Sequence, residues 1–158
     1  MHHHGAMCPD PLEQPGLRLR LGTEHRRISS QHRQLDTLYA SVTAAVERQS
    51  LPEARSAFLR FRDAWDAHTG LEDTFYFPAL HGLRPDLVTP LVTFCDEHAR
   101  FRDVLTEVEH AFEREELAVA ATMLESLISN IAEHERREEE LARDLGLDGR
   151  KGPGTEGE

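Results

Sequence analysis

The chain has 158 residues, of which 39% are hydrophobic and 30% charged, and this composition fits one soluble globular domain. Its formal net charge of −11 argues against nonspecific nucleic-acid binding and against attachment to anionic membrane surfaces. No apolar run approaches the roughly 20 residues that span a bilayer. The two cysteines are too few for a disulfide framework, and no signal peptide is visible at the start. We therefore expect a cytoplasmic monomer or homodimer without nucleic-acid or membrane partners.

Both ends of the chain are expected to be disordered. Residues 1–16 form a proline-rich, flexible extension, in which three histidines followed by Gly-Ala-Met resemble a tag remnant. These histidines are excluded from any site. Residues 148–158 are rich in glycine and charge and are predicted to be a disordered tail.

Residues 17–147 are predicted to form four helices, with breaks near 49–52, 81–86 and 113–117. Within each helix, apolar residues recur at steps of three and four, which is typical of a helix that buries one face. The buried faces are predicted to include Phe75 in the second helix and Val88 in the third. Four helices with short connections favour an all-α, up-down-up-down bundle.

Every predicted helix places an ionisable residue on its apolar face. Buried imidazoles and carboxylates are costly unless they are paired or bound to a cation. One buried histidine is commonly a hydrogen-bonded core residue, but interruptions in all four helices point to a shared site. The interrupting residues, in chain order, are His32, His68 with Glu72, His98, and His134 with Glu138.

The positions of the breaks predict that these residues lie at one level. Facing residues of an antiparallel hairpin lie symmetrically about its turn. The midpoint of positions 32 and 68 is residue 50, that of 72 and 98 is residue 85, and that of 98 and 134 is residue 116. All three midpoints fall in predicted breaks. Each His-x-x-x-Glu pair extends about 6 Å along its helix, a spread that suits two metal ions better than one.

The chemistry of these side chains narrows the choice of metal. Imidazole and carboxylate ligands without thiolate suit iron, manganese or zinc. Carboxylates can bridge two cations, as in known di-iron bundles. Four imidazoles and two bridging carboxylates would leave coordination positions open for a small molecule, which is typical of a reactive site.

Together these motifs resemble the hemerythrin-like family of HHE cation-binding domains, over about residues 20–145. The resemblance implies a four-helix bundle that holds two non-haem iron ions, bridged by carboxylates and by an oxo or hydroxo group, with the six residues above as ligands. It rests on His32 in QHRQL, on His68-x-x-x-Glu72 followed by FYFPAL, on the pair Glu97-His98, and on His134-x-x-x-Glu138.

The sequence departs from the oxygen-carrying members of that family. Those have HxxxH in the third helix, whereas Phe94 and Arg102 stand four residues from His98. They have HxxxxD in the fourth helix, whereas this chain has HxxxE, or Glu139 at the fifth place. The pattern is closer to hemerythrin-like proteins of actinobacteria, some of them catalase-like, and to eukaryotic iron-sensing domains.

These departures favour reaction or sensing over reversible oxygen transport. We expect a di-iron protein that binds or reacts with dioxygen, hydrogen peroxide or nitric oxide, either as a catalase-like catalyst or as a sensor of oxygen or iron. The alternative is a structural bundle with a zinc or mononuclear metal site and no redox activity.

Several further residues have two interpretations. His25, two turns before His32, is either an extra ligand or a residue that supports the site from outside. Glu97 is expected to be solvated or to support a ligand rather than to bind metal. Cys95 is expected to be a small buried apolar residue. His81 and His110 are expected to lie on the surface.

Overall fold

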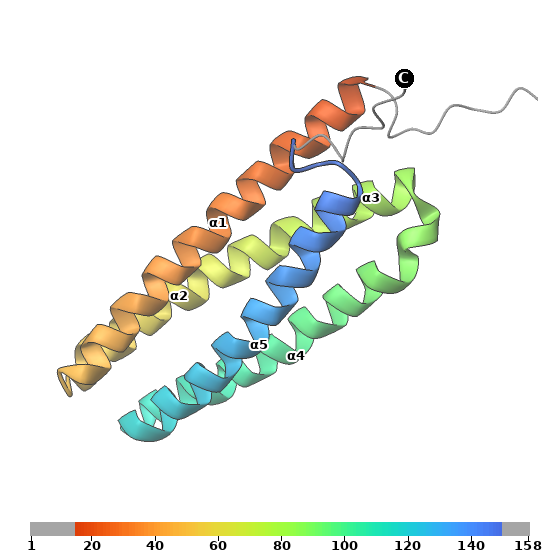
Figure 1. The fold of residues 1–158 in the computed structure, drawn as a ribbon. Coiled ribbons are helices and arrows are strands. Elements are labelled where there is room, and N and C mark those ends of the chain that lie inside the picture. Colours follow the sequence, from red (N-terminus) through yellow and green to blue (C-terminus); the bar gives the residue numbers. More distant parts are fainter. Residues whose placement is uncertain (1–14, 150–158) are drawn as a thin grey trace, which may run out of the picture.

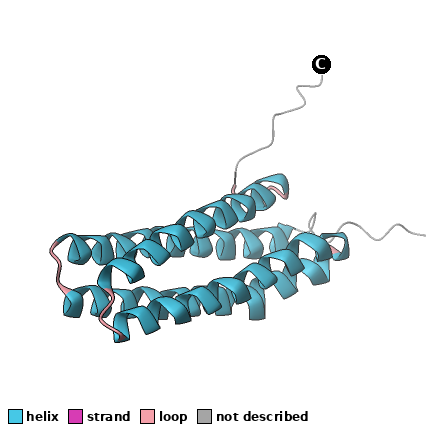
Figure 2. Cartoon of the chain, turned by 90° about the horizontal axis from the view of Figure 1, so that it is seen from below, coloured by secondary structure: helices cyan, strands magenta, loops and turns pink. Residues whose placement is uncertain are grey.

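The computed structural model describes residues 15–149, and within them every regular element is helical. The hairpin of α1 with α2 packs beside the hairpin of α4 with α5, while α3 continues the line of α2 (Figure 1). Figure 2 shows the long helices running side by side with short loops at their ends. The predicted all-α, up-down-up-down bundle is therefore confirmed. The elements are α1 (Pro15–Glu47), α2 (Leu51–Leu71), a π-helical segment (Glu72–Tyr76), α3 (Phe77–Leu83), a 3₁₀ turn (Pro85–Leu87), α4 (Val88–Glu113) and α5 (Leu117–Asp144).

The ends of the described range differ slightly from the predicted boundaries. The expected extension 1–16 lies outside the described residues except for Pro15 and Gly16, which begin α1. The expected tail 148–158 likewise lies outside them except for Asp148 and Gly149. Between residues 15 and 149, no helix is both long and apolar enough to cross a membrane.

Three of the helices end in the same way, with one residue in the left-handed conformation. These residues are Gln49 (φ 56°), Glu115 (φ 60°) and Gly146 (φ 71°). In each case the N–H of the next residue donates to the carbonyl oxygen five residues earlier, at 2.9–3.1 Å. This bond satisfies a carbonyl that the end of the helix would leave without a partner. The first two stops fall in the predicted breaks at 49–52 and 113–117.

The buried face of the second helix differs from the prediction in the π-helical segment. Phe75 is 48% exposed, whereas Tyr76 and Phe77 are buried. A π-helical turn contains one extra residue, so every side chain after Glu72 rotates relative to a continuous α-helix. The prediction that Phe75 is buried was therefore wrong. Val88 was also wrongly predicted to be buried, since it lies at the first turn of α4, where Leu87 and Leu91 fill the inward positions.

The buried residues form two apolar clusters with a band of ionisable residues between them. Along α1, Ile28 belongs to one cluster and Leu35 to the other, and His32 lies between them. Along α5, Ile131 and Ala142 flank the histidine and glutamate in the same way. We call this band the polar layer; it comprises His32, His68, Glu72, His98, His134 and Glu138.

Candidate metal centre

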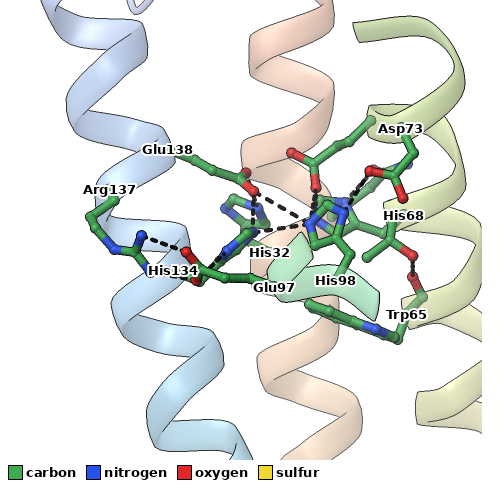
Figure 3. A network of polar contacts seen from close by, with 12 residues as sticks. His32, Trp65, His68, Asp73, Glu97, His98, His134, Arg137 and Glu138 are labelled. Atoms are coloured by element: carbon green, nitrogen blue, oxygen red, sulfur yellow. Dashed lines mark hydrogen bonds and ion pairs between the residues drawn. The ribbon is translucent and has the colours of Figure 1, made fainter. Parts of the chain in front are cut away.

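The polar layer is supplied by all four long elements of the bundle. Each of its six side chains belongs to a residue less than 9% exposed, and Glu72 and His98 are fully buried. Figure 3 shows the imidazoles converging from separate helices, with Glu138 beside them. The structure thus brings together every residue that the sequence placed at this level. Glu72 is also the first residue of the π-helical segment.

The Nε2 atoms of the imidazoles face the two carboxylates. His68 Nε2 lies 2.9 Å from Glu72 Oε1, and His98 Nε2 lies 3.6 Å from the same oxygen. Glu138 is approached from three sides: its Oε1 lies 3.7 Å from His98 Nε2 and contacts His134 Nε2, and its Oε2 lies 3.7 Å from His32 Nε2. All of these contacts point inward, to the centre of the bundle.

These donor atoms form two groups, each compact enough to hold a metal ion. In each group one ligand atom per residue lies within 4.8 Å of all the others. Glu138 belongs to both groups, so its carboxylate is placed to bridge two ions. One group is His32, His68, Glu72 and Glu138, and the other is His98, His134 and Glu138.

The Nδ1 atom of each imidazole faces an acceptor outside the layer. A carboxylate or an amide oxygen can only accept, so the Nδ1 atoms of His68, His98 and His134 carry the proton and donate it. Their Nε2 atoms are then free to act as ligands, which is the arrangement seen around metal-binding histidines in general. The four contacts are His68 with Gln31 Oε1 (2.8 Å), His98 with Asp73 Oδ1 (2.8 Å), His134 with Glu97 Oε2 (3.0 Å) and His32 with Glu139 Oε1 (3.4 Å).

Several inward-facing atoms have no hydrogen-bond partner among the described residues. They include both oxygens of Glu72, both oxygens of Glu138, and His32 Nε2. In addition, His98 Nε2 and His134 Nε2 lie only 3.0 Å apart. Because both rings already donate through Nδ1, their Nε2 lone pairs face each other unless one ring gains a second proton. A cation would satisfy the carboxylates and separate the two lone pairs, so the donor set fits a metal.

The pKa values of the layer also favour a bound cation. Burial, followed by repulsion from His32, lowers the pKa of His68 to about 3, so this imidazole is neutral near pH 7. Burial and the neighbouring Glu138 carboxylate raise the pKa of Glu72 well above its usual value. Burial alone would also raise the pKa of Glu138, but its contacts with His134, His98 and Glu72 together outweigh burial and lower that pKa. These shifts favour a protonated Glu72 beside an ionised Glu138, and a cation between the two carboxylates would keep both ionised.

His25 lies beside the polar layer but outside both groups. Its Nε2 is 3.2 Å from Glu139 Oε2, and the same carboxylate accepts a hydrogen bond from Ser29 at 2.7 Å. Glu139 in turn reaches His32. Within residues 15–149, His25 therefore contacts the acceptor of a layer histidine and not the layer carboxylates.

The structure also settles the environment of other residues noted in the sequence. Glu97 is buried, and besides His134 it binds Arg137 through two hydrogen bonds, so it holds a histidine of the polar layer in place and is not solvated. Cys95 is only half-buried. Burial and the nearby Asp73 raise the pKa of its thiol to about 11. His81 and His110 are both exposed, as expected.

Sequence reasoning missed three of the four outer acceptors as partners of the histidines. A signal was available, because each acceptor adjoins a layer residue in the sequence. A residue adjacent to a buried position lies about 100° around the helix, on the flank that meets the neighbouring helix. Polar residues on that flank can reach an imidazole from the next helix. The four acceptors are Gln31, Asp73, Glu97 and Glu139.

Comparison with known proteins agrees with this geometry. The family model described as hemerythrin HHE cation binding domain matches residues 23–143, which include the whole polar layer. No match was found among curated proteins or among solved structures. A helical bundle with buried histidine and glutamate clusters that could hold a metal ion is what the family description leads one to expect. The chain therefore belongs to the hemerythrin HHE cation-binding domain family.

Proposed function

We propose that this chain is a cytoplasmic, non-haem di-iron protein that binds or reacts with dioxygen, hydrogen peroxide or nitric oxide. The observation that carries the proposal is the position of Glu138, which lies in two adjacent groups of potential ligands at once. A carboxylate shared between two ligand sets is typical of di-iron bundles. The six residues of the polar layer would hold the two ions.

The side chains around the layer would hold the imidazoles in place. Because the outer acceptors fix the proton on Nδ1 of His68, His98 and His134, the Nε2 lone pairs of these rings stay directed at the centre. Aromatic rings pack on the histidines: Trp65 lies 5.9 Å from His98, and Phe101 lies 5.5 Å from His134, between ring centroids. This apolar wall excludes bulk water and strengthens the electrostatic interactions within the layer.

Six side chains shared between two ions would leave positions open for a small molecule. Two iron ions held there would supply Lewis acidity and one-electron redox chemistry toward a diatomic gas or a peroxide. Turnover of hydrogen peroxide and binding of a gas as a sensor both require the same open position. They differ in whether the bound molecule is consumed.

The direct test is reconstitution of the full chain with ferrous iron under anaerobic conditions, followed by controlled exposure to air. We expect about two iron ions per chain and a charge-transfer absorption band in the near ultraviolet. Zinc bound without any such band, or one ion per chain, would support the alternative of a structural or mononuclear site. Oxygen evolution on addition of peroxide would then distinguish a catalase-like catalyst from a sensor.

A matched pair of histidine variants controls for nonspecific metal uptake. His98→Ala removes an imidazole from the layer, whereas His110→Ala removes an exposed imidazole from the same helix, α4. We expect His98→Ala to lose metal and His110→Ala to retain the full amount. Equal loss in both variants would mean that metal binds elsewhere on the chain.

A further inference from the structure

A polar cavity lies between α1 and the end of α5, outside the polar layer. It has a volume of about 430 Å³, which is within the size range of small-ligand sites. Three arginines from the two helices line it: Arg26 and Arg33 of α1 and Arg143 of α5. We call this cavity the arginine pocket.

The arginines of this pocket have no anionic partner in the described part of the chain. Elsewhere seven arginines form ion pairs with carboxylates, as Arg62 does with Glu109. Between residues 15 and 149, by contrast, no carboxylate lies within ion-pair distance of Arg26, Arg33 or Arg143. Other arginines of the described residues, such as Arg55, also lack a carboxylate partner, so what distinguishes this place is that three such arginines line one cavity.

Two acidic residues, Glu139 and Asp148, also line the pocket and offset part of the charge of its three arginines. The Glu139 carboxylate is engaged by Ser29, at 2.7 Å, and by His25, at 3.2 Å, and it also contacts His32. Asp148 has an interaction partner of its own. Among the arginines and carboxylates of the lining one positive charge remains, and a small anion in the cavity would balance it.

We propose that the arginine pocket binds a small oxyanion with two or more charged oxygens, of the phosphate or carboxylate class. The planar guanidinium donates two parallel hydrogen bonds to such oxygens, which makes arginine the preferred side chain for this recognition. The cavity has room for an organic anion as well as for an inorganic one. The inference does not depend on the metal, because none of the three arginines belongs to the polar layer.

The test is calorimetric titration of the full-length, metal-loaded protein with two probes, sodium sulfate and sodium succinate. Sulfate represents tetrahedral oxyanions and succinate represents dicarboxylates, and both bind metal ions weakly. We expect saturable binding of one probe, weakened about tenfold or more by Arg33→Gln and likewise by Arg143→Gln, since each removes charge-assisted hydrogen bonds. Both arginines are exposed, so the variants should fold normally.

Arg55→Gln is the matched control, because Arg55 is an exposed arginine at the start of α2, away from the pocket. Its binding should equal that of the unmodified chain. The stronger of the two probes identifies the class of anion. The proposal is overturned if neither probe saturates, or if binding survives both Arg33→Gln and Arg143→Gln, which would place the anion at the metal or elsewhere on the surface.

Discussion

Replacing Glu97 by glutamine tests whether the outer acceptors control metal binding. The substitution keeps the shape of the side chain and removes its charge. In the structure Glu97 accepts from His134 Nδ1 at 3.0 Å and from Arg137. Burial alone would raise the pKa of Glu97, but these hydrogen bonds outweigh burial and lower it, so the group is a carboxylate at neutral pH. In Glu97→Gln, His134 Nδ1 therefore donates to a neutral oxygen. The His134 imidazole then becomes less basic and a weaker metal ligand.

The expected loss can be estimated from the geometry. Removing an outer partner of a metal-binding histidine typically lowers metal affinity 10- to 100-fold, which corresponds to about 1.4–2.8 kcal/mol. The side chain of Glu97 is only 8% exposed, so water does not replace the lost interaction. Arg137 is 36% exposed and can be hydrated instead. In Glu97→Gln the free energy of metal binding should consequently weaken by more than the free energy of unfolding of the metal-free protein decreases.

The assay is anaerobic competition for ferrous iron against a chromophoric chelator, with thermal unfolding of the same samples. Glu53→Gln is the control, since Glu53 is an arginine-paired but largely exposed glutamate at the far end of the bundle. It should leave iron affinity unchanged. If Glu97→Gln binds iron within about twofold of the unmodified chain while remaining folded, the role assigned to the outer acceptors is refuted.

Three further predictions concern metal, ligand assignment and register. Removal of metal by a chelator should lower Tm, because ligands of the native state stabilise it by roughly 4 kcal/mol at a thousandfold excess over Kd; superimposable melting curves would contradict this. His32→Ala should lose most of its iron, whereas His25→Ala should retain it, since His25 contacts Glu139 and lies outside both ligand groups; metal analysis showing the reverse would show that the assignment is wrong. Phe77→Ala should destabilise the fold by about 3–5 kcal/mol, and Phe75→Ala by less than about 1 kcal/mol, because only Phe77 is buried; equal losses in chemical denaturation would argue against the π-helical register.

Much of the fold and of the polar layer could be predicted because both depend on helical periodicity. Apolar residues at steps of three and four identify the buried face, and the breaks between helices determine which levels face each other. His68 and His134 each stand four residues before a glutamate, so one regular turn brings each pair together. No knowledge of side-chain packing was needed for that step.

The π-helical segment could not be predicted from the same periodicity. Phe75, Tyr76 and Phe77 are all aromatic, so the pattern of apolar residues does not reveal which of them faces inward. An extra residue in a helical turn is decided by tertiary packing around it and not by local propensity. Here the buried carboxylate of Glu72, at the first position of the segment, shares the layer with three other helices.

The outer acceptors were missed for a related reason. Asp73 and Gln31 each lie one residue away from the buried face, where the sequence alone indicates only a solvated flank. Whether such a side chain reaches an imidazole depends on the crossing of neighbouring helices, as with Asp73 of the second helix and His98 of α4. That crossing is a property of the packed bundle.

The most direct test of the account is a crystal structure of the iron-loaded protein with anomalous diffraction at the iron edge. We predict two anomalous peaks in the polar layer, about 3.5–4 Å apart as in other two-metal sites. The Glu138 carboxylate should contact both. A single peak, or two peaks of which only one touches Glu138, would contradict the proposal that this carboxylate bridges a di-iron centre.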